Sequence, residues 1–132
     1  MKINLSIILP CYNEAASLRK LIAQYQSVLD EYTNCELILV DNGSTDESWS
    51  IMQASIATSK NLQICPIQVP ENRGYGHGIL AGLSAASGKF CAWSHADLQC
   101  PPMDVVRLYE KVKKSRDPMH CFGKGHRISD RG

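Results

Sequence analysis

The hydrophobic and polar positions of the chain follow one arrangement four times over. Each time, an apolar run is followed by a polar or glycine-rich loop and then by a segment with helical spacing. The apolar runs are residues 3–9, 36–40, 62–69 and 89–94. This order is typical of consecutive βαβ units, in which each run forms a strand and each spaced segment a covering helix. The pattern therefore predicts an α/β fold with a mostly parallel sheet and helices on both faces.

The first two predicted helices have distinct local signals. After the first run, apolar residues recur three and four positions apart, as one helical face requires. These residues are Leu18, Leu21, Ile22, Tyr25, Val28 and Leu29. After the second run, Ser44-Thr45-Asp46-Glu47 matches a capping box. The match predicts that Ser44 and Glu47 satisfy each other's backbone N–H groups at a helix start.

The other two predicted helices differ in the size of their side chains. Small residues would let the third helix lie close against the sheet, and they are Gly78, Ala81, Gly82, Ala85 and Ala86. Pro101 and Pro102 open the fourth, because proline is tolerated at a helix start, where no N–H partner is needed. Its apolar residues are Val105, Leu108, Tyr109 and Val112. A fifth apolar stretch covers residues 119–122.

Length, composition and charge limit the classes of function. A chain of 132 residues with 44% apolar and 20% charged residues fits one globular domain. The net charge of +1 leaves no basic face for nucleic-acid phosphates, so we expect no nucleic-acid partner. The longest apolar run near the start, residues 7–9, is far shorter than the roughly 20 residues of a membrane span, and no leader precedes it. We therefore expect a cytoplasmic protein.

The six cysteines contain no Cys-x-x-Cys pair, and several lie inside apolar runs. We expect them to be buried, reduced thiols. The alternative is a zinc site with ligands from His95, Cys100, His120, Cys121 and His126. The paired short spacings typical of structural zinc are missing from this set.

The polar residues that can carry chemistry follow the predicted strands. The four loops contain residues 10–14, 41–46, 72–78 and 95–99. Ligands of open parallel sheets bind beyond the carboxyl ends of the strands. We therefore expect a binding site where these loops meet.

The first two loops offer candidate contacts to a nucleoside. Asp41 directly follows an apolar run, where a carboxylate can accept hydrogen bonds from a base or from ribose hydroxyls. An Asx-turn is an equal alternative for Asp41. Tyr12 can stack on a base or only cover the edge of the core, and Glu14 can be a first-turn acid favoured by the helix dipole.

The third loop is rich in glycine. Its backbone N–H groups can form a nest at a helix start, with Arg73 supplying positive charge for a diphosphate. Gly76-His77-Gly78-Ile79-Leu80-Ala81 also satisfies the loose dinucleotide fingerprint, with Asp97 roughly 20 residues further on. That alternative needs its first glycine tight against the strand end, whereas residues 70–73 intervene.

The fourth loop is the strongest candidate for a metal site. His95, Asp97 and Gln99 alternate along an extended segment, so their side chains point the same way. Mg²⁺ or Mn²⁺ suits oxygen ligands, and an imidazole favours Mn²⁺. Such a cation can absorb the negative charge of a departing nucleoside diphosphate. In the structural alternative, Asp97 only precedes a helix and His95 ends a buried strand.

Together the four loops resemble the family 2 glycosyltransferases, which have the Rossmann-like GT-A fold. The matching stretches are IILPCYNE at 7–14, VDNGSTD at 40–46, NRGYG at 72–76 and ADLQCPP at 96–102. Four ordered motifs are more specific than any one of them, and the similarity runs through nearly the whole chain. The resemblance is in particular to the polyprenyl-phosphate, or dolichol-phosphate mannose, branch.

The resemblance implies a role for each matching residue. The substrate-binding residues would be Pro10, Tyr12, Glu14, Asp41, Gly43, Arg73, Gly76 and Arg127. Of these, the first four would hold the nucleoside, Arg73 would lie near the donor, and Arg127 would contact its phosphates. Asp97 would be the catalytic residue and principal ligand of Mn²⁺ or Mg²⁺, with Gln99 assisting. His95 stands where the family usually has aspartate, which leaves its metal preference open.

The resemblance also implies the reaction. Residues 1–132 would form a single donor domain that binds a nucleoside-diphosphate sugar for inverting transfer, with a lipid phosphate as acceptor in that branch. Such an acceptor would place the enzyme at the inner membrane face. Family members continue into an acceptor-binding half, so we expect a truncated fold without it, and homo-oligomers are left open. The alternatives are a non-catalytic nucleotide-binding or regulatory module and an NAD(P)-binding oxidoreductase domain.

Overall fold

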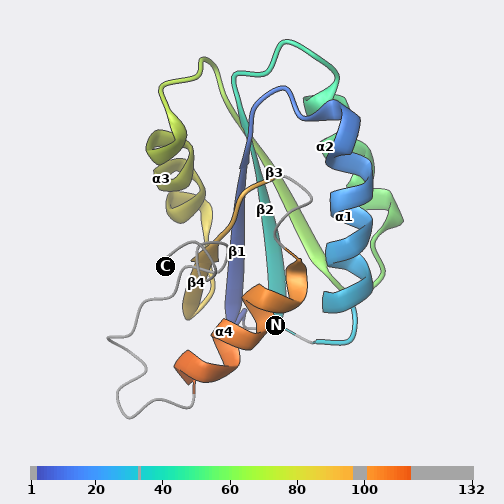
Figure 1. Ribbon diagram of the computed structural model, residues 1–132, viewed down its shortest axis with the longest axis vertical. Coiled ribbons are helices and arrows are strands. Elements are labelled where there is room, and N and C mark those ends of the chain that lie inside the picture. The colour runs from blue at the N-terminus through green and yellow to red at the C-terminus, as the bar shows by residue number, and fades with distance from the viewer. Residues whose placement is uncertain (1–2, 33, 97–100, 114–132) are drawn as a thin grey trace.

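The computed structural model describes residues 3–32, 34–96 and 101–113 (Figure 1). In this part of the chain, strands alternate with helices in the predicted order. The strands are β1 (Leu5–Cys11), β2 (Cys35–Asn42), β3 (Gln63–Val69) and β4 (Phe90–Trp93). The helices are α1 (Ala15–Leu29), α2 (Ser48–Thr58), α3 (Tyr75–Ala85) and α4 (Pro102–Lys113). The predicted α/β fold is confirmed.

The described strands form one sheet in the order β3-β2-β1-β4, and every neighbouring pair is parallel. All residues of the central strands β1 and β2 are buried. A parallel strand covered on both faces needs apolar side chains on both, which explains the unbroken run Ile7-Ile8-Leu9. β3 lies at an edge and contains Pro66, which lacks the N–H that a central strand would need.

Helices cover both faces of the sheet, as Figure 1 shows. On one face, α1, α2 and α4 enclose the larger core, in which Leu18, Tyr25 and Met52 are fully buried. On the other face, α3 covers a smaller core around Ile8 and Val40. Burial of each such large side chain contributes about 1.5–3 kcal/mol. The two cores therefore hold the helices, and with them the loops at the strand ends, in place.

α3 lies close to the sheet because two of its glycines face the strands. A Cβ at Gly82 would clash with Cγ2 of Ile8, and a Cβ at Gly78 would lie 3.2 Å from Cβ of Pro10. Only a residue without a side chain fits at Gly82 unless Ile8 moves. The predicted close approach of this helix is confirmed, and it brings the start of α3 next to the end of β1.

The central strands run further than their apolar runs predict. β1 was expected over 3–9 and ends at Cys11, and β2 was expected over 36–40 and ends at Asn42. Pro10 and Cys11 still pair with Val40 and Asp41 of β2, so the ladder continues past the apolar run of β1. Both strands therefore deliver polar residues directly to the edge where the loops meet.

The predicted capping box is wrong. α2 begins at Ser48, with Glu47 as its N-cap and no side-chain hydrogen bond at that cap. The Oγ atom of Ser44 instead accepts a hydrogen bond from the backbone N–H of Asn13 at 2.9 Å. Asp46, rather than Ser44, accepts the N–H at the helix start. The box fails because a contact with the loop after β1, distant in sequence, takes the Ser44 hydroxyl.

The cysteines of the described residues are free thiols, as predicted. Cys11 and Cys35 are buried, whereas Cys65 and Cys91 are only partly buried. Desolvation, followed by the charge of Glu36, raises the pKa of both Cys65 and Cys91. These thiols are therefore largely protonated at neutral pH.

Some predictions fall on other parts of the chain. The apolar stretch 119–122 and all the proposed zinc ligands except His95 lie outside the described residues. Within the described ranges, no group of three or more His, Cys, Asp or Glu residues is arranged to hold a metal ion. None of the helices in those ranges has the length and apolar character needed to cross a bilayer.

Candidate functional site

The loops that follow β1 and β2 are bonded to each other at the carboxyl-terminal edge of the sheet. Oδ1 of Asn13 accepts hydrogen bonds from the backbone N–H groups of Thr45, at 2.8 Å, and Asp46, at 3.3 Å. Asn13 has a φ of 51°, a left-handed conformation that asparagine tolerates better than most residues. Asn13 therefore fixes the position of the second loop relative to the first.

Asp46 links the starts of α1 and α2. Its Oδ1 accepts hydrogen bonds from the backbone N–H and the hydroxyl of Ser48, at 2.9 and 2.6 Å. Its Oδ2 accepts from the N–H of Ala15 at 3.1 Å. Both N–H groups belong to the first residues of helices, whose dipoles favour a negative charge there. The bond from the Ser48 hydroxyl is the main reason that the pKa of Asp46 is lowered.

The loop between β3 and α3 is fastened to the end of β2. Nδ2 of Asn42 donates a hydrogen bond to the carbonyl of Gly74 at 3.1 Å, and the N–H of Gly74 donates to Oδ1 of Asn72 at 2.8 Å. Gly43 has a φ of 75° and lies against this loop. A Cβ at position 43 would lie 2.5 Å from the backbone nitrogen of Asn72. Glycine is therefore required at position 43 by both conformation and space.

A cavity of about 180 Å³ lies where these loops meet the end of β4. Its walls come from all four strand ends and from the start of α3. The lining residues are Pro10, Cys11, Tyr12, Glu14, Asn42, Asn72, Tyr75, His95 and Ala96. The four loops that the sequence predicts to carry functional residues thus converge on one site.

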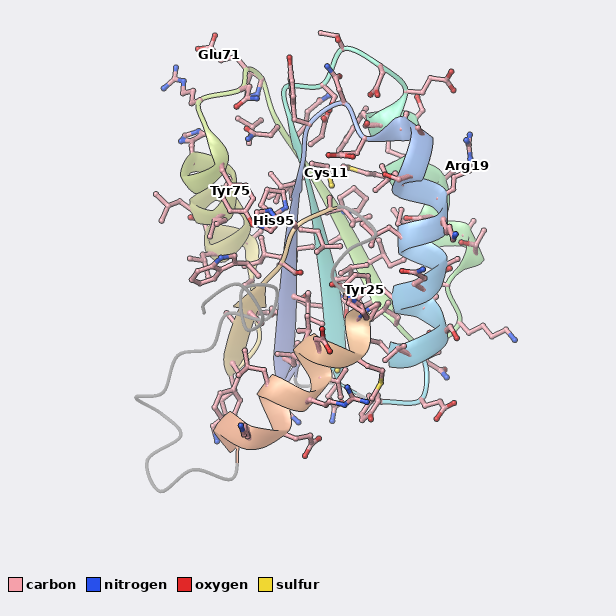
Figure 2. The ribbon with its side chains drawn as sticks, in the orientation of Figure 1. Cys11, Arg19, Tyr25, Glu71, Tyr75 and His95 are labelled. Atoms are coloured by element: carbon pink, nitrogen blue, oxygen red, sulfur yellow. The ribbon has the colours of Figure 1, made fainter. Side chains whose placement is uncertain are left out.

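Two stacked aromatic rings form part of the cavity wall. The ring centroids of Tyr75 and His95 are 4.8 Å apart, and the ring planes differ by 26°. Figure 2 shows the pair between α3 and the sheet. Tyr75 is the first residue of α3, and His95 lies just beyond β4. The stack therefore joins the start of α3 to the segment that leads to Asp97.

Cys11 also reaches the cavity, but as a neutral group. Its Sγ donates to the carbonyl of Leu9 at 3.3 Å. Burial, followed by the charges of Glu14 and Asp41, raises the pKa of the Cys11 thiol well above its ordinary value. A protonated thiol is a poor nucleophile, so Cys11 contributes packing rather than covalent chemistry.

Asp41 and Arg73 are not among the described residues that line the cavity. Asp41 is buried, and its carboxylate accepts hydrogen bonds from the N–H of Ser44 at 3.1 Å and from Nε2 of Gln68 at 3.4 Å. Within the described structure the Asp41 carboxylate thus holds the turn that follows β2. Arg73 is exposed and forms an ion pair with Glu71 at 3.2 Å. An exposed pair is worth at most about 1 kcal/mol, so Arg73 can turn toward a ligand at small cost.

The structure brings together part of the predicted site. Pro10, Tyr12, Glu14 and His95 line the cavity. Gly76 lies in the first turn of α3, with open space on its Cβ side. The predicted residues Asp97, Gln99 and Arg127 lie outside the described residues.

Five of the lining residues were not among the predicted site residues, namely Cys11, Asn42, Asn72, Tyr75 and Ala96. Successive side chains of a strand point to opposite faces, so Asn42 faces away from Asp41. That alternation was a usable signal, because Asp41 and Asn42 continue the β2 pattern. Tyr75 carried no such signal, because only the packing of α3 against β1 brings its ring to the cavity.

The family model described as glycosyl transferase family 2 matches residues 6–130 of the chain. The chain belongs to this family. The match includes every residue that lines the cavity. The resemblance found in the four loop motifs is therefore confirmed.

Curated relatives match with about one residue in three identical. The chain is 33% identical over 113 residues to the undecaprenyl-phosphate 4-deoxy-4-formamido-L-arabinose transferase of Aeromonas hydrophila. That alignment covers 85% of the chain and 34% of the relative. The chain thus spans about a third of the length of this curated relative. The relative's name contains a polyprenyl phosphate, in agreement with the predicted branch.

Solved structures of glycosyltransferases share the fold. A mannosyltransferase from Pyrobaculum calidifontis, in complex with GDP-Man and Mn²⁺, superposes with a TM-score of 0.73 at 24% identity, over 88% of this chain and 34% of that one. Glucosyl-3-phosphoglycerate synthase from Mycobacterium tuberculosis, with Mn²⁺, UDP and glucosyl-3-phosphoglycerate, gives 0.67 at 24% identity, over 86% and 41%. These likenesses confirm the predicted GT-A fold.

The start of α3 does not have the geometry of a dinucleotide fingerprint. Gly76 and Gly78 lie inside the helix, and residues 70–74 separate them from β3. The fingerprint needs its first glycine in a tight turn directly after the strand. This geometry and the family assignment together exclude the NAD(P)-binding alternative.

Proposed function

We propose that this chain is the donor-binding part of a glycosyltransferase and that it binds a nucleoside-diphosphate sugar at the cavity between the strand ends. The observation that carries the proposal is the convergence of four family motifs on that one cavity. Further support comes from two solved structures of the same fold, one of which contains GDP-Man and the other UDP.

We assign the nucleoside to the β1 side of the site. Tyr12 is 46% exposed, so its ring is available to stack on a base, and Pro10 and Glu14 lie beside it in the cavity. Asp41 and Gly43 shape the turn behind them, and the nucleoside could still reach the Asp41 carboxylate if Gln68 gives way. The diphosphate would extend toward Arg73, the N–H groups around Gly76, and Arg127.

We propose Mn²⁺ or Mg²⁺ as the metal. His95 and Glu14 line the same cavity, so it presents both an imidazole and a carboxylate, a mixture of ligand types that favours Mn²⁺. Asp97 and Gln99 would add oxygen ligands from the segment after His95. When bound, the cation would neutralise charge that develops on the departing diphosphate. The protein's own part is to hold the donor in a fixed orientation and to exclude water from it.

For the acceptor we propose a polyprenyl phosphate, supported by the name of the curated relatives. A phosphate oxygen carries negative charge at neutral pH and needs no enzyme base to become a nucleophile. It would form a bond to the anomeric carbon as the bond from that carbon to the diphosphate breaks, with inversion of configuration. The reaction would then take place where the lipid phosphate meets the cytoplasm.

Thermal unfolding tests donor binding. UDP or GDP should raise the melting temperature of the chain only when Mn²⁺ or Mg²⁺ is present, because the ligand binds the folded state preferentially. Asp97→Ala should remove the metal dependence, whereas Glu31→Ala, an exposed acid beyond the far end of α1, should leave it unchanged. Absence of any nucleotide signal in calorimetry on the unaltered chain would overturn the proposal.

Turnover separates an enzyme from a non-catalytic module of the same fold. The chain would be incubated with UDP-glucose or GDP-mannose, Mn²⁺ and undecaprenyl phosphate, and released nucleoside diphosphate would be measured. Release that depends on the lipid phosphate supports transfer. Metal-dependent binding without release would instead assign the chain as a nucleotide-binding or regulatory module.

A further inference from the structure

Asn42 is the last residue of β2, and within the described structure only one of the two polar atoms of its side-chain amide forms a hydrogen bond. The residue is 3% exposed. Its Nδ2 donates to the carbonyl of Gly74 at 3.1 Å, whereas its buried Oδ1 has no hydrogen-bond partner among the described residues. The reverse amide orientation would bring two carbonyl oxygens together, so the Gly74 bond fixes Oδ1 as the free acceptor.

A buried acceptor without a partner is unfavourable, by about 1–3 kcal/mol in proteins generally. Such groups are rare in folded proteins, and a ligand or an ordered water commonly completes them. Asn42 lines the cavity together with Tyr75 and His95. The cavity thus contains an acceptor held in one orientation and ready for a donor group.

The surroundings keep the Asn42 amide where it is. A Cβ at Gly78 would lie 3.2 Å from Nδ2 of Asn42, so the backbone of α3 closes the space behind the amide. Gly74 is itself held by Asn72, through a 2.8 Å bond from the Gly74 N–H to Oδ1 of Asn72. Asn42 therefore cannot easily turn away to find another partner.

We propose that Oδ1 of Asn42 accepts a hydrogen bond from a ring hydroxyl of the bound nucleotide sugar and so makes Asn42 a specificity-determining residue. The inference deepens the proposed function and depends on it. A neutral carbonyl oxygen cannot bond an ionised phosphate oxygen, because both are acceptors. Hydroxyls are the abundant donors of such a ligand, and they belong either to the ribose or to the transferred sugar.

Calorimetry on the whole chain with Mn²⁺ tests the proposal. The probes are UDP, 2′-deoxy-UDP, 3′-deoxy-UDP and UDP-glucose, with the guanosine series and GDP-mannose if guanosine is the base that binds. Asn42→Ala should weaken binding roughly threefold to tenfold for the ligands that have the contacted hydroxyl. The analogue without it should lose less affinity in Asn42→Ala, by only the factor that the missing Nδ2 bond to Gly74 costs every probe. If one of the deoxy-UDP analogues shows this smaller loss, the contacted hydroxyl belongs to the ribose. If the larger loss is confined to UDP-glucose, the contacted hydroxyl belongs to the transferred sugar.

Two further variants separate the contact from a general loosening of the loop. Asn72→Ala releases the Gly74 N–H but keeps the Asn42 acceptor, so it should change the affinity of all the probes by the same factor. Asn42→Asp keeps an oxygen at the Oδ1 position but places the other oxygen against the Gly74 carbonyl, so it should weaken every probe by a common factor and still distinguish the hydroxyl-bearing probe from its deoxy analogue. Circular dichroism and thermal unfolding confirm that each variant is folded.

The possible results distinguish this inference from the proposed function. If Asn42→Ala weakens every probe equally, as Asn72→Ala should, Asn42 only supports the loop and the inference is overturned while donor binding stands. The inference is also overturned if Asn42→Ala leaves every affinity unchanged. In that case Oδ1 of Asn42 in the unaltered chain is bonded to water and not to the ligand. If the unaltered chain binds none of the nucleotides, both proposals fall together.

Discussion

Asp41 and Asn42 are neighbours in the sequence but work on opposite faces of the sheet. The Asp41 carboxylate accepts bonds from Ser44 and Gln68, whereas the Asn42 amide lines the cavity and holds Gly74. The acidic residue that stands out in the motif thus builds a turn within the described structure. The less conspicuous amide faces the cavity, because side chains alternate along a strand.

Loss of Asn13 should loosen the whole loop edge. Asn13→Ala removes the acceptor for the N–H groups of Thr45 and Asp46 and places alanine at a φ of 51°. We expect the free energy of unfolding in urea to fall by about 2–3 kcal/mol, from lost hydrogen bonds and from strain. Asn13→Gly removes the bonds without the strain and should cost about 1–2 kcal/mol. Wild-type stability in Asn13→Gly would show that the bonds contribute nothing.

The contact of α3 with β1 predicts opposite effects for two glycines of one helix. Gly82→Ala would push a methyl group into Ile8, so the variant should be destabilised by about 1–3 kcal/mol, although alanine favours helix. Gly76→Ala meets open space and should be neutral or stabilising by up to about 1 kcal/mol. Chemical denaturation of both variants measures the difference. Equal stability of the two would contradict the close packing of α3.

Glu36 anchors the chain after α3 at the opposite end of the sheet. The residue is 2% exposed, and its Oε2 accepts bonds from the Ser6 hydroxyl at 2.6 Å and from the N–H and hydroxyl of Ser87 at 2.8 and 3.0 Å. Glu36→Ala removes all three bonds and leaves the buried Ser6 hydroxyl without this acceptor, so it should destabilise the fold by about 2–4 kcal/mol. Glu36→Gln keeps an oxygen acceptor and should lose less. Urea unfolding of both variants checks the order.

Asp46 should make stability depend on pH in the acid range. Its pKa is lowered in the folded state from the ordinary 3.8, so its contribution is complete above that value and disappears as the pH falls through the folded-state pKa. Asp46→Asn should therefore lower the melting temperature at pH 7, and the difference from the unaltered chain should shrink below pH 3.8. Glu47→Gln, at the neighbouring N-cap without a side-chain cap bond, is the matched control. A difference that stays constant down to pH 2 would contradict this role.

Much of the fold could be predicted from local pattern. The unbroken apolar run Ile7-Ile8-Leu9 indicated a strand buried on both faces, and the spacing of Leu18, Ile22 and Tyr25 indicated the buried face of α1. These predictions succeeded because strand and helix periodicity repeat over a few residues. The small residues of α3 also pointed correctly to close packing, since a missing side chain is visible in the sequence itself.

The site was predictable only in part. Pro10, Tyr12, Glu14 and His95 meet in one cavity as expected from the rule that parallel strands present their carboxyl ends at one edge. The capping box failed, because the Ser44 hydroxyl bonds Asn13 across 31 positions of sequence, a competition that no local motif records. The stacking of Tyr75 on His95, and the lack of a partner for Oδ1 of Asn42 among the described residues, depend likewise on how the helices and strands pack.

The amino-acid sequence by itself therefore determined the family, the βαβ order and the loops in which chemistry would be found, because those features are written in short-range spacing and composition. Tertiary structure alone decided which side chains of those loops face the ligand and which hold the loops together. The physical reason is that a polar group bonds whichever partner the packed helices and strands bring within about 3 Å, whatever its distance along the chain.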